Sequence, residues 1–183
     1  VVYQDLLRIT RDIQDGSFEK NPAFVRMMTR LKEEDHALHF MGLLSDGGVH
    51  SHQEHLYALL EMAKNFGLTK VYVHAFMDGR DVSPTSGVHY LDQLQEKLDA
   101  IGVGQLATVS GRYYAMDRDK RWERVERAWK AMVCGEGEQV SDVQAAMQAS
   151  YENDVTDEFI VPMVVQGGEG RIREEDGIIF YNF

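Results

Sequence analysis

Hydrophobic residues along the chain follow two spacings, one typical of amphipathic helices and the other of buried strands. Several segments have apolar residues at intervals of three or four positions, which predicts helices with one buried face. Runs of β-branched, aromatic and other apolar residues lie between them and predict strands. The predicted helices cover 1–16, 22–31, 51–67, 83–102, 118–133 and 141–153, and the predicted strands cover 38–44, 70–77, 105–110, 158–165 and 177–183.

The order of these elements predicts the fold class. Strand and helix alternate with a spacing of about 30 residues, which is typical of βαβ units and a parallel sheet. We therefore predict an α/β fold, a layered α/β/α domain with a largely parallel central sheet. The chain has no internal repeat and no low-complexity linker, so residues 1–183 form one domain in this interpretation. Pro162 favours an edge position or a bulge for the strand at 158–165.

Local sequence signals indicate where two of the helices begin and which face a third one buries. Asn21 and Pro22 are typical of an N-cap and the first helical position. The sequence SHQE at 51–54 predicts a capping box at the start of the third helix. In the segment 118–133, Trp122, Val125, Trp129 and Met132 share one helical face, and we expect both tryptophans to be in the core.

Composition and charge then exclude several classes of protein. Hydrophobic residues make up 44 % and charged residues 27 % of the chain, so neither disorder nor a coiled coil is expected. A net charge of −11 argues against nucleic acid or an anionic membrane as a partner. The single cysteine, Cys134, excludes a disulfide framework and a cysteine-rich zinc site. No secretory leader is recognisable, and we expect a cytoplasmic protein.

The two ends of the sequence suggest a longer parent chain. The sequence starts at Val1 without a methionine and stops at Phe183 within an apolar, strand-like run. We therefore expect this chain to be a fragment.

Three polar loops are the candidate sites of chemistry. Each follows the carboxyl end of a predicted parallel strand and precedes a helix: 45–50, 78–81 and 111–118. Ligands of open α/β sheets bind outside the strand carboxyl ends, so these loops should converge on one cleft. The side chains they bring are His50, His52, Arg80, Asp81, Arg112 and Arg118.

Three arginines at such positions favour an anionic ligand. The planar guanidinium group matches the oxygens of phosphate and carboxylate, and helix N-termini add backbone donors. The simplest ligand is a small, doubly anionic metabolite such as a phosphorylated carboxylic acid. Structural alternatives remain: Arg80 could belong to a turn network with its aspartate neighbours, and Arg118 could lie on a solvated helix start.

A histidine cluster offers a competing interpretation. His50, His52 and His55 lie close together in the sequence, and imidazole is a common zinc ligand. Three ligands from this one segment would need a strained loop, so we favour His50 as a donor to an anion and expect no metal. A histidine-metal hydrolase nevertheless stays open as an alternative.

Four motifs in these regions resemble the cofactor-independent phosphoglycerate mutase family. They are GLLSDGGVHSH at 42–52, DGRD at 78–81, SGRYYAMDRDKRWER at 110–124 and IIFYNF at 178–183. The resemblance extends over nearly the whole chain. It implies an enzyme that interconverts 3-phosphoglycerate and 2-phosphoglycerate in glycolysis and gluconeogenesis. It also implies two domains, a phosphatase-like domain with a nucleophilic serine and two manganese ions, and an inserted substrate-binding (transferase) domain. This chain resembles the inserted domain alone.

The resemblance also implies roles for individual residues. His50 would contact the substrate, Arg80 and Asp81 would bind the glycerate, and Arg112 and Arg118 would hold its anionic groups. Asp81 would be the general base for the glycerate hydroxyl.

The serine and manganese ligands of the phosphatase-like domain are absent from this sequence, and a further arginine-containing segment is expected after Phe183. The chain alone is therefore expected to be inactive and to hold no cofactor, its partners being phosphoglycerate and its own phosphatase-like domain. A free-standing anion-binding module that regulates a partner is the alternative.

Overall fold

A six-stranded sheet is the centre of the computed structural model, which describes residues 4–183. The strand order is β4-β5-β3-β2-β1-β6. The first three residues of the helix predicted over 1–16 lie outside the described part. The strands are β1 (Leu38–Leu43), β2 (Val71–Met77), β3 (Gln105–Gly111), β4 (Glu138–Val140), β5 (Met163–Val165) and β6 (Gly177–Phe180).

The sheet is largely parallel, as the order of elements predicts. β1 lies between β2 and β6 and is parallel to both, and β2 is also parallel to β3. β5 pairs antiparallel with β3 and parallel with β4. The carboxyl ends of β1, β2 and β3 therefore lie at one edge of the sheet, where the three candidate loops begin.

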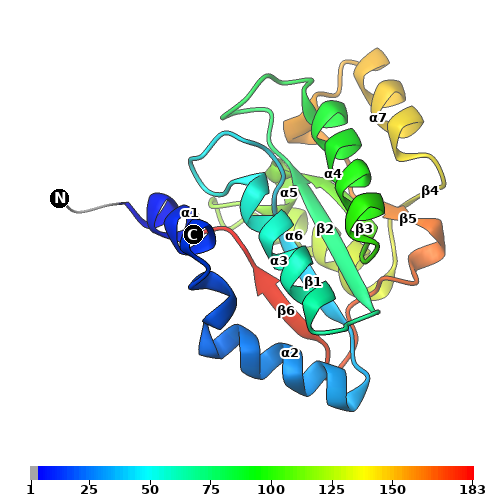
Figure 1. Ribbon diagram of the computed structural model, residues 1–183. Helices are drawn as coiled ribbons and strands as arrows, with labels where there is room; N and C mark the ends of the chain where they lie inside the picture. Colours follow the sequence, from blue (N-terminus) through cyan, green and yellow to red (C-terminus); the bar gives the residue numbers. More distant parts are fainter. Residues whose placement is uncertain (1–3) are drawn as a thin grey trace.

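Helices cover both faces of the sheet, which confirms the layered α/β/α prediction (Figure 1). In β2, Val73 and Ala75 belong to the large core that includes α3 and α4, whereas Phe76 packs with Ala128 and Met132 on the opposite face. The α-helices are α1 (Asp5–Asp15), α2 (Pro22–Glu34), α3 (Gln53–Asn65), α4 (Gly87–Ile101), α5 (Arg112–Ala115), α6 (Trp122–Trp129) and α7 (Val143–Glu152).

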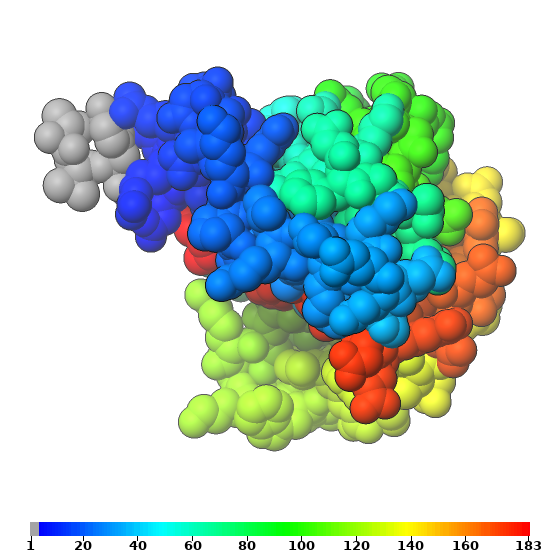
Figure 2. Space-filling model, turned by 60° about the horizontal axis from the view of Figure 1, so that its bottom comes forward, coloured from blue at the N-terminus to red at the C-terminus, as the bar shows by residue number. Residues whose placement is uncertain are grey.

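The N-terminal helices close one end of the molecule. Asn21 caps α2 by accepting a hydrogen bond from the Ala23 amide at 3.0 Å, as predicted. Figure 2 shows α2 beside the segment that leads into β6. Arg30 of α2 joins the two by donating to the Glu175 carbonyl at 3.0 Å. Among residues 4–183, no helix combines the length and the apolar character needed to cross a membrane.

The starts of α3 and α4 differ from the sequence prediction. The N-cap of α3 is His52, whose Nδ1 accepts from the Glu54 amide, and Ser51 instead donates to the Leu43 carbonyl at 2.6 Å. The predicted capping box is therefore wrong. The helix predicted from residue 83 begins only at Gly87, whose amide donates to the Asp157 carboxylate at 2.7 Å.

The prediction of two core tryptophans is wrong. The helix predicted over 118–133 begins at Trp122 and continues after Trp129 as a π-helical turn, Lys130–Cys134. Trp122 is 70 % exposed and Trp129 is 50 % exposed. The buried face of this helix consists of Ala128, Ala131 and Met132, and the small alanines let its backbone approach the sheet closely.

The strand predicted over 158–165 is shorter than expected. Asp157–Phe159 is a 3-10 turn, and only Met163–Val165 forms a strand, β5. β5 is an interior strand, because β4, which the pattern did not predict, lies outside it. Pro162 precedes β5, and its carbonyl accepts from the Glu138 amide at 3.1 Å. The edge position inferred from Pro162 is therefore wrong.

Candidate functional site

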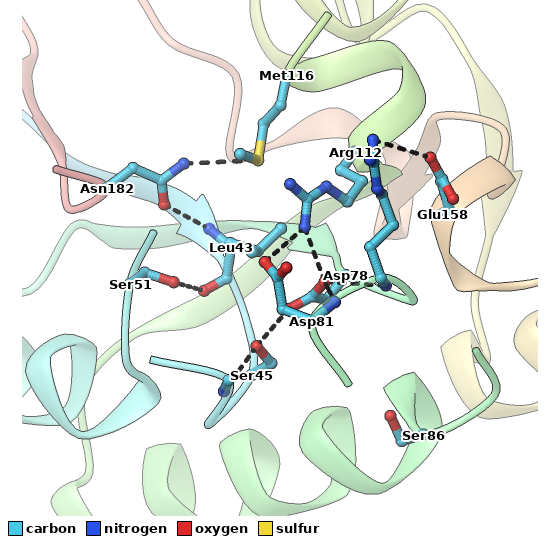
Figure 3. Close-up of polar contacts among 12 residues, drawn as sticks. Leu43, Ser45, Ser51, Asp78, Asp81, Ser86, Arg112, Met116, Glu158 and Asn182 are labelled. Atoms are coloured by element: carbon cyan, nitrogen blue, oxygen red, sulfur yellow. Dashed lines mark hydrogen bonds and ion pairs between the residues drawn. The ribbon is translucent and has the colours of Figure 1, made fainter. Parts of the chain in front are cut away.

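A buried arginine with two carboxylate partners joins two of the candidate loops. Arg112 is the first residue of α5, directly after β3, and its side chain is 6 % exposed. Its Nη1 donates to Asp78 Oδ1 at 2.9 Å and to Asp81 Oδ2 at 2.9 Å (Figure 3). A buried charge is tolerated when it is paired and hydrogen-bonded, and this arginine has two counterions.

Asp78 organises the turn that follows β2. Its Oδ1 accepts the amides of Arg80 and Asp81 at 3.1 and 2.9 Å, and its Oδ2 accepts the hydroxyl of Ser45 at 2.7 Å. Burial alone would raise the pKa of Asp78, but these hydrogen bonds and the Arg112 guanidinium outweigh burial and hold the pKa below its ordinary value. One carboxylate thus fixes all three loops relative to each other.

A cavity of about 540 Å³ opens beside this ionic cluster. Four arginines from three segments lie on its wall, accompanied by acidic side chains. The charged residues on the wall include Arg80, Arg112, Arg118, Arg124, Asp117 and Glu158. Such a concentration of cations in a chain of net charge −11 makes this cavity the candidate site for an anion.

The four arginines differ in how firmly they are paired. Arg112 has its two carboxylates, and Arg124 pairs with Asp117 at 3.1 Å while its guanidinium lies 3.9 Å from the Tyr113 ring centroid. Arg80 is 54 % exposed and lies 3.8 Å from Glu158, a distance too long for a hydrogen bond. Within residues 4–183, Arg118 has no ion pair. Arg80 and Arg118 are therefore the cations with charge to offer a ligand.

The remaining predicted residues lie around this cavity in different ways. The structure brings Arg80, Arg112 and Arg118 to its wall and places Asp81, 20 % exposed on its side chain, against Arg112. His50 is not on the wall. It lies half-buried in the neighbouring loop, where its carbonyl accepts the Phe183 amide at 3.0 Å. Gly47 of that loop packs against Asp81, because a Cβ at Gly47 would lie 3.1 Å from the Asp81 Cβ.

The histidine cluster is not arranged as a metal site. His52 Nδ1 accepts a backbone amide, and His55 Nε2 lies 2.9 Å from the Thr10 hydroxyl, which links α3 to α1. Burial, followed by the neighbouring His52, lowers the pKa of His55 to about 4. In the part of the chain that the structure describes, no group of three His, Cys, Asp or Glu side chains could hold a metal ion.

Sequence reasoning did not find several residues of the site. Asn182 accepts the Leu43 amide at 2.9 Å and contacts the Met116 sulfur, which fixes the C-terminal segment beside β1. Tyr90 donates to Asp46 at 2.6 Å, and burial followed by this carboxylate raises the Tyr90 pKa to about 12. Glu158 lies in a segment that looked like a strand. The motif at 178–183 contains Asn182 but gave it no role, and nothing local marks Glu158.

Comparison with known proteins gives closely related sequences and closely similar structures. The chain is 54 % identical over 186 residues to a 2,3-bisphosphoglycerate-independent phosphoglycerate mutase of Clostridium perfringens, and 54 % identical over 187 residues to that of Moorella thermoacetica. Both alignments cover 100 % of this chain and 36 % of the relative, so the chain spans about a third of their length. A crystal structure of Leishmania mexicana phosphoglycerate mutase superposes with a TM-score of 0.93 at 31 % identity, covering 100 % of this chain and 35 % of that one.

A protein-family model gives the assignment. The model described as "BPG-independent PGAM N-terminus (iPGM_N)" matches residues 9–183, which include every loop of the candidate site. The motifs that carried the resemblance lie within the matched range, and the fold agrees with that of the related structure. The chain therefore belongs to the family of N-terminal regions of bisphosphoglycerate-independent phosphoglycerate mutases.

Proposed function

We propose that residues 1–183 form the substrate-binding (transferase) domain of a cofactor-independent phosphoglycerate mutase. In this proposal the domain binds 2- or 3-phosphoglycerate and positions the glycerate for phosphoryl transfer. The observation that carries the proposal is the pair of available cations, Arg80 and Arg118, on a cavity built around the buried Arg112. The names of the relatives support the same substrate class.

The arrangement of charge suits a ligand with two anionic groups. Arg80 follows β2 and Arg118 follows α5, so each can hold a different end of a small molecule. Arg112 lies at the base of the cavity, with both of its described partners on Nη1. Its other guanidinium hydrogens face no described carboxylate and can donate to a ligand oxygen. Three arginines thus match the phosphate and carboxylate of phosphoglycerate.

Asp81 is the residue that we assign to proton transfer. Arg112 holds one of its oxygens, Oδ2, while the side chain stays partly accessible. A carboxylate oriented in this way can accept the proton of a glycerate hydroxyl as that hydroxyl takes up the phosphoryl group. His50, from the adjacent loop, would close over the ligand and donate to an anionic oxygen.

The rest of the reaction is assigned to the part of the parent enzyme outside this chain. We propose that a phosphatase-like domain supplies the serine that carries the phosphoryl group, together with two manganese ions. The described residues of this chain hold no ligand set for a metal. The chain alone should then bind substrate in the cytoplasm of its source without mutase activity.

The test is a titration of the chain with 3-phosphoglycerate, followed by NMR at low salt. Wild type should show saturable shifts at Arg80, Arg112 and Arg118. Arg118→Ala should weaken binding about tenfold or more, because a charge-assisted hydrogen bond contributes roughly 1.5–3 kcal/mol. Arg118 is preferable to Arg112 as the test position, since it is exposed and unpaired and its loss should leave the fold intact.

The matched control is Arg121→Ala, which removes a nearby exposed arginine that is not on the cavity wall. Its affinity should stay within about twofold of wild type. Equal weakening by both variants would show only a general charge effect. No shifts up to tens of millimolar ligand would contradict the proposal that this chain carries a preformed site.

A further inference from the structure

The short segment Asp157–Ile160 packs against both loops that carry the site arginines. A Cβ at Gly79, which has φ +63, would lie 2.8 Å from the Glu158 amide nitrogen. A Cβ at Gly111 would lie 2.3 Å from the Glu158 carbonyl oxygen, and the Gly111 amide donates to the Ile160 carbonyl at 2.8 Å. The two glycines precede Arg80 and Arg112. The backbone of this segment therefore fixes the positions of both arginines.

Asp157 holds the segment in place through hydrogen bonds. Its carboxylate accepts the Gly87 amide at 2.7 Å and a short hydrogen bond from the Tyr151 hydroxyl. Its own amide donates to the Pro84 carbonyl at 2.9 Å. Because these hydrogen bonds hold the backbone, the Glu158 side chain projects from a fixed position.

The Glu158 side chain points into the cavity. It is 23 % exposed, lies on the cavity wall, and brings Oε1 to 3.8 Å from Arg80 Nη1. Figure 3 shows its carboxylate turned toward the arginine cluster from the neighbouring segment. Arg112 and Arg124 have carboxylate partners at 2.9 and 3.1 Å, so Arg80 is the wall arginine with a close but loosely held counterion.

We propose that Glu158 sets the affinity of this site for anions: it is a built-in competitor that an anionic ligand must displace from Arg80. An anion that binds Arg80 has to separate the guanidinium from Glu158 and approach a second negative charge. The first cost is the same for every anion, and the second grows with the charge of the ligand. Glu158 thereby keeps anion binding at this site weak. This inference rests on the anion site of the proposed function and deepens it.

A double-mutant cycle tests the proposal with three probes, 3-phosphoglycerate, inorganic phosphate and glycerate. Glu158→Gln should tighten the binding of 3-phosphoglycerate and of inorganic phosphate by about three- to tenfold. The substitution removes the competing charge and keeps the shape of the side chain. It should also raise the affinity for glycerate, by a smaller factor, because glycerate carries one charge. In an Arg80→Ala background the same change should have less than about a twofold effect. Glu152→Gln, an exposed change on α7, controls for the altered net charge.

The outcomes separate this inference from the proposed function. Tighter binding of inorganic phosphate by Glu158→Gln, without any binding of 3-phosphoglycerate, would support the role of Glu158 and contradict the substrate assignment. Unchanged or weaker binding in Glu158→Gln would overturn the role of Glu158, whether or not 3-phosphoglycerate binds. Equal tightening in the Arg80→Ala background would overturn it too, because the effect would then be general repulsion. Failure of both wild type and Glu158→Gln to bind any anion would also overturn it.

Discussion

The same three strands, β1, β2 and β3, carry two polar clusters that are built on opposite principles. At their carboxyl ends, Asp78, Asp81 and Arg112 form an ionic cluster, with two further arginines open to solvent. Within the sheet, a hydrogen-bonded chain runs from Asp176 through His39 and His74 to Thr108. The first cluster includes arginines that have no close carboxylate partner, whereas every ring nitrogen in the second cluster has a hydrogen-bond partner.

The histidine chain has a single arrangement of donors when both imidazoles are neutral. Thr108 donates to His74 Nδ1 at 2.9 Å, His74 donates from Nε2 to His39 at 3.0 Å, and His39 donates from Nε2 to Asp176 at 3.0 Å. Burial lowers the pKa of His74 to about 3, and burial lowers that of His39 despite the opposing Asp176. Every ring nitrogen has a partner, so this cluster stabilises the fold and has no free atom for a ligand.

The contrast between the two clusters shows which features allow a polar cluster to bind a ligand. Both clusters include buried side chains from adjacent strands, yet only the one at the strand ends borders a cavity and has cations in excess of their partners. Changes to the histidine chain should therefore affect stability alone. Changes to the exposed cations should affect binding alone, and changes to Asp78 and Arg112 should affect both.

The largest expected effect is on stability and comes from Asp78→Asn. The variant leaves Arg112, 6 % exposed, with one carboxylate and weakens the bonds that hold the three loops together. Breaking a buried ion pair costs about 3–5 kcal/mol, and we expect a loss of that size in the free energy of unfolding. Urea denaturation measures it, with the exposed Asp92→Asn on α4 as control. A loss below about 1 kcal/mol would show that the ionic cluster is not structural.

The next effect is the dependence of stability on pH. The folded pKa of His74 lies below its unfolded value, so the unfolded state binds the proton first as the pH falls. Stability is therefore complete above pH ~6.5 and decreases as the pH falls toward the folded pKa of about 3, by up to about 1.4 kcal/mol per pH unit for this one group. Urea denaturation at several pH values should give a flatter dependence for His74→Gln than for wild type. The exposed His89→Gln should keep the wild-type slope, and equal slopes for all three would contradict the prediction.

A smaller effect is expected from Thr108→Val, which tests whether the two clusters are independent. The substitution keeps the shape and removes the hydroxyl that donates to His74, leaving a buried ring nitrogen without a partner. An unsatisfied buried polar group costs about 1–3 kcal/mol. Denaturation should show that loss, while the affinity for 3-phosphoglycerate stays within about twofold. A parallel loss of affinity would show that the clusters are coupled.

The fold was largely predictable from the sequence because its central strands are continuous apolar runs. β1, β2 and β3 are buried on both faces, and such strands need no alternation to be recognised. β4 escaped prediction because Glu138–Val140 is short and polar and is a strand only through its pairing with β5. A pairing partner that distant in the chain leaves no local pattern.

The candidate site was predictable to the extent that it follows the strand ends. The loops after β2 and β3 pointed to Arg80, Asp81 and Arg112, and the topology brings them together as expected. Glu158 could not be found in this way, because it reaches the cavity through contacts with Gly79 and Gly111 that only the tertiary structure defines. The resemblance to the family gave roles to residues but did not distinguish the buried Arg112 from the exposed Arg118.

The smallest expected effect concerns Trp122, where helical spacing predicted a core residue and the structure shows an exposed one. Trp122 is 70 % exposed at the start of α6, directly after the loop that carries Arg118. Truncation of a core tryptophan costs about 3–5 kcal/mol, whereas we expect Trp122→Ala to change the free energy of unfolding by less than about 0.5 kcal/mol. Ala128→Trp is the matched contrast, because Ala128 packs against the sheet and is 1 % exposed. A large side chain at this position should destabilise the fold by at least about 1–3 kcal/mol. Urea denaturation of both variants would decide which face of α6 is buried. A large loss for Trp122→Ala would mean that Trp122 is a core residue, as its helical spacing predicted.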